Sequence, residues 1–245
     1  MHDVGVFYHC YKENDAVEFS VKSFKNLYPD SPMYIVSDNG NDFSYLEKKY
    51  KNIKFIKKNN EVQSLVKFVD NLIAANNVDI DLFTDIAIEV LNRIKNAIDY
   101  CQSKYIILME PDVYVRSKFS LPKTDMVGPI PNEMPINVQE YIISKGGINN
   151  KYWGPAGGIM NTQAFLDIYS KIDKTIISEI LLQDPRIVCY DYLLPVLFSI
   201  YGYRYENNPE QTECLRNPNW EISDHKILHQ YRKYFDGNYD GKHKE

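Results

Sequence analysis

Two carboxylates separated by one residue form the sharpest chemical feature of this 245-residue chain. Glu110 and Asp112 flank Pro111 directly after the apolar run 105–109, whose composition is typical of a buried strand. Carboxylates at the end of a strand can ligate Mg²⁺ or Mn²⁺, and such an ion can bridge the oxygens of a diphosphate. Of the two, we expect Asp112 to bind the metal directly. A solvated turn after a strand explains the same residues, so the pair alone leaves both interpretations open.

Asp191 lies just before the apolar stretch 193–197, which is expected to be helical. Its carboxylate could serve as a catalytic general base that takes a proton from an acceptor hydroxyl. It could also simply stabilise the helix, because a negative charge near a helix N-terminus interacts favourably with the helix dipole. The sequence leaves both roles open.

His225 and His229 are four residues apart, a spacing that would put both on one face of a helix. His229 is therefore a candidate third metal ligand, although an ordinary surface histidine would look the same. Arg232 and Lys233 follow directly. Either cation could assist the departure of a diphosphate, and Lys233 is a candidate donor-binding residue.

His9 and Tyr11 come at the end of the first expected strand, and Asp38 comes at the end of the second. Ligands in an open α/β sheet bind outside the carboxyl ends of the strands, so these side chains are expected at the same edge as Glu110. Asp38 could bind a ribose hydroxyl or a base, and Tyr11 could stack on the base. Ordinary turn chemistry also explains Asp38.

Gly157 and Gly158 belong to a glycine-rich loop at 153–158. Glycine lets backbone amides approach a phosphate or a sugar closely. An ordinary tight turn would need the same residues. The position of this loop after the two carboxylates is what makes it a candidate binding element.

The order of the expected elements predicts a sheet that would position these residues. Apolar runs indicate strands at 4–10, 33–37, 53–56 and 105–109. Helical periodicity and breakers indicate helices at 15–28, 43–50, 64–75 and 83–101. This alternation favours an α/β fold with a mixed, mostly parallel sheet and helices on its faces.

The second half of the chain has a weaker pattern. The stretch 132–151 has little regularity and is expected to be an insertion or a flexible lid. The other expected elements are short strands at 126–130 and from Ile159, a helix at 162–172, one long helix at 187–201 and an edge strand at 203–206. No repeat or linker marks a domain boundary.

Composition excludes several classes of protein. The net charge of −5 is spread along the chain, so nucleic acid is not an expected partner. No apolar run reaches the roughly 20 residues of a transmembrane helix, and the first residues lack a signal-peptide pattern, so we expect a cytoplasmic protein. The 4 cysteines are far apart and form no CxxC pair, which predicts reduced thiols rather than a disulfide framework or a zinc cage.

Taken in chain order, these motifs resemble the GT-A class of glycosyltransferases. The apolar strand followed by Glu110-Pro111-Asp112 is similar to the DxD motif of that class, and Asp38 is similar to the acidic residue after its second strand. Asn92-Arg93 resembles its Arg-Asn region, and Gly157-Gly158 resembles the glycine turn that opens its acceptor half. The small size and the Lys-, Asn- and Tyr-rich composition are also similar to glycosyltransferases of large DNA viruses, which would place the protein in a host cytoplasm.

The resemblance implies a single GT-A-like, Rossmann-like domain over 1–245, with a nucleotide-sugar-binding half at 1–115 and an acceptor-binding half at 116–245. It implies transfer of a sugar from a nucleoside-diphosphate sugar, a UDP- or GDP-sugar, to a hydroxyl of a glycan or glycoconjugate, with Mn²⁺ or Mg²⁺. Asp191 would be the base of an inverting enzyme, and His229 would complete the metal site with Asp112 and Glu110. The implied donor-binding residues are His9, Tyr11, Asp38, Arg93, Glu110, Asp112, Gly157, Gly158 and Lys233.

The motif departs from the class in one respect, because Glu110 stands where an aspartate is usual. Its longer side chain could reach the ribose, the metal through water, or neither. If Asp191 only stabilises a helix, a retaining reaction stays open. Two other functions also stay open. One is a sugar nucleotidyltransferase, although 9–14 lacks the glycine-rich phosphate loop expected after the first strand. The other is an inactive nucleotide-sugar-binding protein of the same fold.

Overall fold

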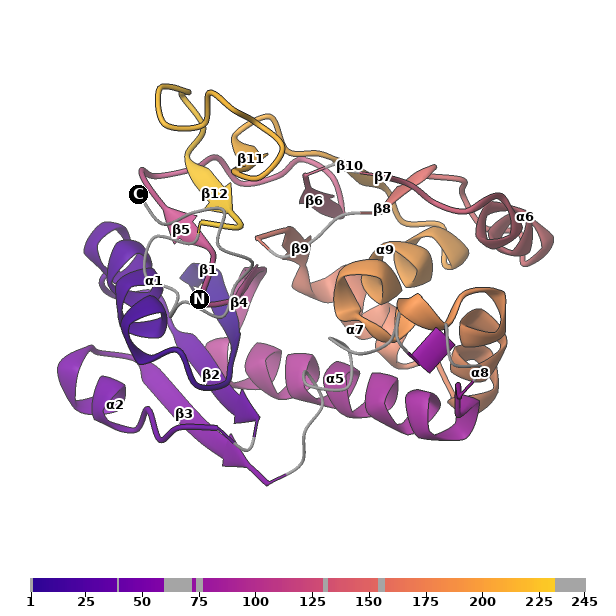
Figure 1. Cartoon of the computed structure of the whole chain (residues 1–245), viewed down its shortest axis with the longest axis horizontal. Coiled ribbons are helices and arrows are strands. Elements are labelled where there is room, and N and C mark those ends of the chain that lie inside the picture. The colour runs from indigo at the N-terminus through magenta and orange to yellow at the C-terminus, as the bar shows by residue number, and fades with distance from the viewer. Residues whose placement is uncertain are drawn as a thin grey trace.

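The computed structural model describes residues 2–38, 40–59, 72–73, 77–129, 132–153 and 157–231. Its main feature is a seven-stranded sheet with the order β10-β6-β9-β4-β1-β2-β3 (Figure 1). In this sheet β9 runs antiparallel to β4 and β6, and the remaining neighbours are parallel. The strands are β1 (His2–Cys10), β2 (Met33–Asp38), β3 (Ile53–Lys58), β4 (Ser103–Met109), β6 (Met126–Gly128), β9 (Ile159–Asn161) and β10 (Tyr205–Asn207). The predicted mixed, mostly parallel sheet is confirmed, with β10 at its edge.

Helices cover both faces of this sheet, and the alternation of side chains along the strands explains why. Phe7 and Leu108 pack on the face that carries α5, α7, α8 and α9, whereas Tyr8 and Met109 pack on the face that carries α1. Every one of these four side chains is at most 1% exposed, so both faces bury apolar surface. The helices are α1 (Asn14–Leu27), α2 (Tyr45–Lys49), α5 (Ile80–Cys101), α6 (Ile136–Ser144), α7 (Thr162–Tyr169), α8 (Lys174–Gln183) and α9 (Tyr190–Ile200), with a 3₁₀ turn η1 (Pro185–Val188).

Two small sheets complete the described fold. β7 (Asn132–Glu133) pairs with β8 (Tyr152–Trp153). β12 (Ile227–His229) lies between β11 (Gln211–Glu213) and β5 (Tyr114–Val115) in a three-stranded sheet. Because β5 begins two residues after Asp112, this sheet brings the C-terminal part of the chain to the carboxyl end of β4.

Two predictions about the second half are wrong, and one helix was not predicted. The stretch 132–151 contains α6, which buries Val138 and Ile142 in the core, so it is not an irregular insertion or lid. The stretch 187–201 is not one helix, because Cys189 has an extended backbone that separates η1 from α9. α8 was not expected, although its buried residues Ile177, Ile180 and Leu181 have helical spacing. The predicted helix at 64–75 lies largely outside the described residues.

The predicted helical relation between His225 and His229 is also wrong. Residues 227–229 form a strand, so the two histidines do not share a helix face. Ile227 and Leu228 are both fully buried between neighbouring strands and the core. A strand of three residues is too short for its periodicity to be distinguished from that of a helix turn.

None of the helices in the described part of the chain has the length and apolar character that crossing a bilayer requires. All four cysteines are free thiols, as predicted. Burial raises the pKa of the Cys10 and Cys189 thiols well above the usual value and that of Cys101 and Cys214 to about 12. Because the thiolate is the reactive form, we expect these cysteines to be unreactive.

Lys25 is a buried lysine whose ammonium group binds carbonyls in the two segments that lead into β2 and β3. The Lys25 ammonium donates hydrogen bonds to the carbonyls of Pro29, Ser31 and Lys51 at 3.2, 2.7 and 2.6 Å. We expect Lys25→Met to lower the free energy of unfolding by about 3 kcal/mol, because it leaves buried carbonyls without a charged donor. Chemical unfolding would measure this loss. Lys22→Met, at an exposed position of the same helix, is the matched control, and equal stabilities of the two variants would contradict the prediction.

Candidate active site

The carboxyl ends of β1, β2 and β4 meet at one edge of the main sheet. The parallel register pairs Tyr8 with Met109 and Cys10 with Ser37. The residues that follow these positions are therefore neighbours, and they include the acidic turn after β4. This arrangement is the one predicted from the sequence.

The turn after β4 is fixed from two directions. The Ser20 hydroxyl of α1 lies 3.2 Å from the Glu110 carbonyl and 2.6 Å from the Val113 carbonyl, and it can donate to both. On the other side, the Tyr231 amide donates to the Asp112 carbonyl at 2.9 Å. The two carboxylates therefore project from a backbone that is held both by the first helix and by the C-terminal segment.

Strand pairing brings His229 to this turn. Ile227 pairs with Val115 and Leu228 with Tyr114 in antiparallel register, so the next residue of β12 lies beside Asp112. His229 Nε2 is 3.8 Å from Asp112 Oδ1. Ligand atoms of Glu110, Asp112 and His229 all lie within 4.8 Å of one another. The structure thus brings together the three side chains predicted to hold a metal.

Glu213 supports His229 from the other side. It pairs with His229 in the parallel register of β11 and β12, and its Oε1 is 3.3 Å from His229 Nδ1. Burial would lower the pKa of His229, but the charge of Asp112 and the hydrogen bond and charge of Glu213 raise it to about 9. The carboxylates of Glu110 and Asp112, whose ligand atoms lie close to His229, are groups that attract a divalent cation.

The donor set fits a divalent metal of the Mn²⁺ type. Carboxylate oxygens suit Mg²⁺, Ca²⁺ and Mn²⁺, whereas imidazole suits softer transition ions, so two carboxylates with one histidine favour Mn²⁺ over Mg²⁺. Asp112 and His229 are 8% and 5% exposed, while Glu110 is partly exposed. A cation held here would keep a face toward solvent or a ligand.

Asp191 lies in the first turn of α9 and interacts electrostatically with the same cluster. Burial, together with the charge of Glu110, raises its pKa well above the usual value for a carboxyl. Its Oδ1 is buried and accepts no hydrogen bond from the described residues, and its Oδ2 contacts the Cys189 thiol at 3.6 Å. Neither oxygen therefore makes a capping hydrogen bond to α9, and the carboxyl is available for other chemistry.

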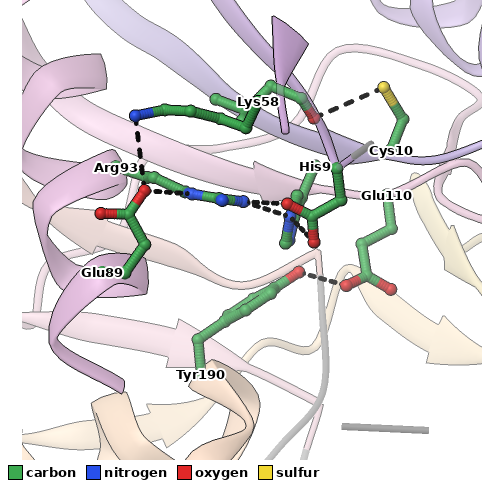
Figure 2. A network of polar contacts seen from close by, with 9 residues as sticks. His9, Cys10, Lys58, Glu89, Arg93, Glu110 and Tyr190 are labelled. Carbon is green, nitrogen blue, oxygen red and sulfur yellow. Dashed lines mark hydrogen bonds and ion pairs between the residues drawn. The ribbon is translucent and has the colours of Figure 1, made fainter. Parts of the chain in front are cut away.

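Tyr190 is a site residue to which the sequence assigned no role. Its hydroxyl donates to Glu110 Oε1 at 2.6 Å (Figure 2). Its ring packs edge-on against Phe7, with the ring centroids 6.3 Å apart. The break at Cys189 starts α9 at Tyr190, and this start aims the ring at the end of β4. Tyr190 thus fixes the orientation of the longer side chain that replaces the usual aspartate.

His9, Asp38 and Arg93 form one buried polar cluster (Figure 2). Asp38 Oδ1 is paired with the Arg93 guanidinium and Oδ2 lies 3.2 Å from His9 Nε2, and each of the three residues is 1% exposed. Glu89 accepts from Arg93 Nε at 3.0 Å and lies 3.4 Å from the Lys58 ammonium. The visible role of this cluster is to tie α5 to the ends of β1 and β2. That these residues contact a nucleotide-sugar donor stays a prediction.

The Asp38 cluster should make the fold sensitive to acid. Burial alone would raise the pKa of Asp38, but His9 and then Arg93 hold it well below its usual range. The resulting stabilisation is present above the unfolded-state pKa of about 3.9 and is lost as the pH falls below it. We expect Asp38→Asn to cost about 3–5 kcal/mol at pH 7, and the cost to shrink between about pH 4 and pH 2. Unfolding free energies across this range would test it, and a constant difference would contradict it.

The remaining predicted donor-binding residues lie in different surroundings. Tyr11 is partly exposed after β1, with the Lys12 ammonium 4.6 Å from its ring centroid. Gly157 and Gly158 are buried beside β4, and the Gly157 amide donates to the Leu108 carbonyl at 2.6 Å. Gly157 has a φ of +88°, and a Cβ there would lie 2.3 Å from the Gln211 side chain, so only glycine fits. Ligand binding by these residues stays a prediction, and Lys233 lies outside the described residues.

A polar cavity lies beside the metal-ligand cluster. Its volume is about 420 Å³, and it opens to solvent between the ends of β6 and β10 and the loop that joins β11 to β12. Polar side chains dominate its lining and include Asn207, Thr212, Glu213, Arg216, Asn217 and His225. Since Glu213 both lines this cavity and contacts His229, the cavity adjoins the candidate metal site.

The solved structures that share this fold include two of the galactosyltransferase LgtC. One is galactosyltransferase LgtC in complex with donor and acceptor sugar analogues, with a TM-score of 0.51 and 16% identity over 91% of this chain and 86% of that chain. The other is an active-site mutant of LgtC, with a TM-score of 0.50 and 15% identity over the same shares. No protein-family profile and no curated protein matches the chain. Neither structural likeness supports a viral origin. The chain therefore has a glycosyltransferase fold of the GT-A type, as its motifs implied.

Proposed function

We propose that this protein is a metal-dependent glycosyltransferase that moves a sugar from a UDP- or GDP-sugar to a hydroxyl of a glycan or glycoconjugate. The observation that carries the proposal is the cluster of Glu110, Asp112 and His229, whose ligand atoms lie within 4.8 Å of one another. Residues 119 positions apart in sequence meet there, at the sheet edge where open α/β folds bind ligands. The similarity to a galactosyltransferase that was solved with donor and acceptor sugar analogues supports the same activity class.

Asp112 and His229 would hold the cation, with Glu110 as a third ligand. When bound, Mn²⁺ or Mg²⁺ supplies positive charge that stabilises a departing nucleoside diphosphate. The protein contributes a rigid frame: Ser20 and the Tyr231 amide hold the turn, and Tyr190 holds Glu110. Ligands fixed in this way need little reorganisation during the reaction, which is the main source of electrostatic catalysis.

Asp191 would act as the general base. It accepts the proton of the acceptor hydroxyl, whose oxygen bonds to the anomeric carbon as the bond to the diphosphate oxygen breaks on the opposite face. This geometry inverts the anomeric centre. The raised pKa of Asp191 makes its ionised form a stronger proton acceptor than an ordinary carboxylate, and its buried Oδ1 accepts no hydrogen bond from the described residues.

The two substrates would bind on the two halves of a single domain, 1–115 and 116–245. Among the proposed donor-binding residues, Tyr11 is partly exposed and suited to stacking on a base, whereas His9, Asp38 and Arg93 would act from the buried cluster. Gly157, Gly158 and Lys233 complete the proposed donor set. The polar cavity of about 420 Å³ is a suitable place for the acceptor, because hydroxyl-rich ligands need many hydrogen-bonding partners.

A specific observation favours a second candidate, an inactive nucleotide-sugar-binding protein. Glu110 Oε1 already accepts a hydrogen bond from Tyr190, which reduces its freedom to reorganise around a metal. Such a protein would bind a nucleotide sugar without turning it over.

A thermal-shift screen tests the proposal. Nucleoside diphosphates and nucleotide sugars would be added to the full chain with and without Mn²⁺. A ligand that binds the native state stabilises it by mass action, about 2.7 kcal/mol at a concentration 100-fold above Kd. We expect one nucleotide to raise Tm only when Mn²⁺ is present, which would also identify the donor. If every compound leaves Tm unchanged with Mn²⁺, the proposed function is wrong.

A further inference from the structure

We propose that Glu213 is a positioning residue that orients His229 as a metal ligand. This inference rests on the proposed function, since it assumes that the cluster binds a cation. The two side chains come from neighbouring strands, β11 and β12, whose parallel register places them directly side by side. The Glu213 carboxylate is 3.3 Å from His229 Nδ1, and His229 Nε2 is on the side of Asp112, 3.8 Å from its Oδ1.

The chemistry of imidazole gives this contact its meaning. A neutral imidazole has one N–H and one lone pair, so a carboxylate that accepts from Nδ1–H leaves the lone pair on Nε2. Nε2 is the atom that lies on the side of Asp112. Histidine ligands in metal sites are generally fixed in this way by a carboxylate or a carbonyl on the second ring nitrogen, which sets the tautomer and the ring orientation.

Glu213 is itself held in place. Its residue exposure is 6%, and Oε2 lies 3.1 Å from Arg216 Nε on the loop after β11. A buried carboxylate is costly unless it is paired, so two partners on its two oxygens indicate a defined orientation rather than loose packing. Successive polar contacts therefore connect Arg216 to Glu213, Glu213 to His229, and His229 to Asp112.

Glu210 offers a matched control for this position. It lies three residues before Glu213 in sequence, and its carboxylate accepts from Ser120 and pairs with Lys226. It is therefore a hydrogen-bonded glutamate of the same region, and none of its side-chain contacts with the described residues reaches the metal-ligand cluster. Glu210→Gln should affect local stability without affecting metal binding.

The test is Mn²⁺ binding by the full chain without nucleotide, measured by calorimetric titration. We expect Glu213→Ala to weaken Mn²⁺ binding about 10- to 100-fold. Glu213→Gln, which keeps an acceptor oxygen and the side-chain volume, should have an intermediate effect and remain folded. Glu210→Gln should match the wild type. Nitrogen-15 NMR of the metal-free proteins above about pH 9, where His229 is neutral, should show Nδ1–H for His229 in the wild type and a changed tautomer balance in Glu213→Ala.

The outcomes separate the two proposals. If the wild type binds Mn²⁺ and both Glu213 variants bind it equally well, Glu213 has only a structural role and the inference is overturned while the proposed function stands. A drop in thermal stability with unchanged affinity and an unchanged His229 tautomer would lead to the same conclusion. If the wild type binds no Mn²⁺, the proposed function fails and the inference fails with it.

Discussion

Asp112→Asn is expected to abolish metal-dependent sugar transfer, with a loss of at least about 10³-fold in turnover. The Asp112 carboxylate is buried beside His229, where it would contribute both charge and a ligand oxygen. Metal-ion catalysis supplies several kcal/mol of transition-state stabilisation, and each 1.36 kcal/mol corresponds to about tenfold in rate. Asparagine keeps the shape of the side chain but removes its charge. Turnover and Mn²⁺ affinity, measured on the same preparation, would report the effect.

The matched control for this change is Asp99→Asn. Asp99 is exposed on α5 and pairs with Lys95 far along the helix from the site, so its replacement should leave transfer unchanged. If Asp112→Asn transfers sugar at a rate within tenfold of the control, the metal site is not where we place it. Unfolding curves of both variants would show that any loss does not arise from misfolding.

Asp191→Asn is expected to reduce turnover by about 10²–10⁴-fold, the usual contribution of general acid–base catalysis. The two side chains have nearly the same shape, so substrate binding should change little and the loss should be in kcat. The variant should also be at least as stable as the wild type without metal. Because burial and Glu110 raise the pKa of Asp191, its ionised form destabilises the fold above the usual carboxyl range, and asparagine removes that charge.

Asp173→Asn separates this role from simple stabilisation of a helix. Asp173 caps α8 by accepting from the Ile176 amide, and its replacement should leave transfer unaffected. Near-normal transfer by folded Asp191→Asn would eliminate Asp191 as the base and would favour a retaining reaction.

The part of the site that lies on long buried strands could be predicted from the sequence. β1, β2 and β4 are nearly continuous apolar runs, as expected for strands buried on both faces, and their ends identify the ligand-binding edge. The predicted proximity of Glu110, Asp112 and His229 is confirmed, although the helical spacing used for His229 is wrong.

The part of the site that depends on short strands, paired with segments distant in sequence, could not be predicted. β11 and β12 have three residues each, and no local pattern indicates that Glu213 pairs with His229. The contact of Tyr190 with Glu110 depends on where α9 begins, and helix boundaries depend on backbone geometry at single residues such as Cys189. Both contacts arise only once the main sheet has brought the two halves of the chain together.

Release of nucleoside diphosphate from a nucleotide sugar is the most direct test of the central claim. The wild type would be incubated with the donor chosen by thermal shift, with Mn²⁺ or with a chelator, in the presence of a panel of glycan acceptors. We predict that nucleoside diphosphate and glycosylated acceptor appear together, only with Mn²⁺, and not with Asp112→Asn. Metal-dependent binding of the donor without release of any nucleoside diphosphate would contradict the account and identify an inactive binding protein instead.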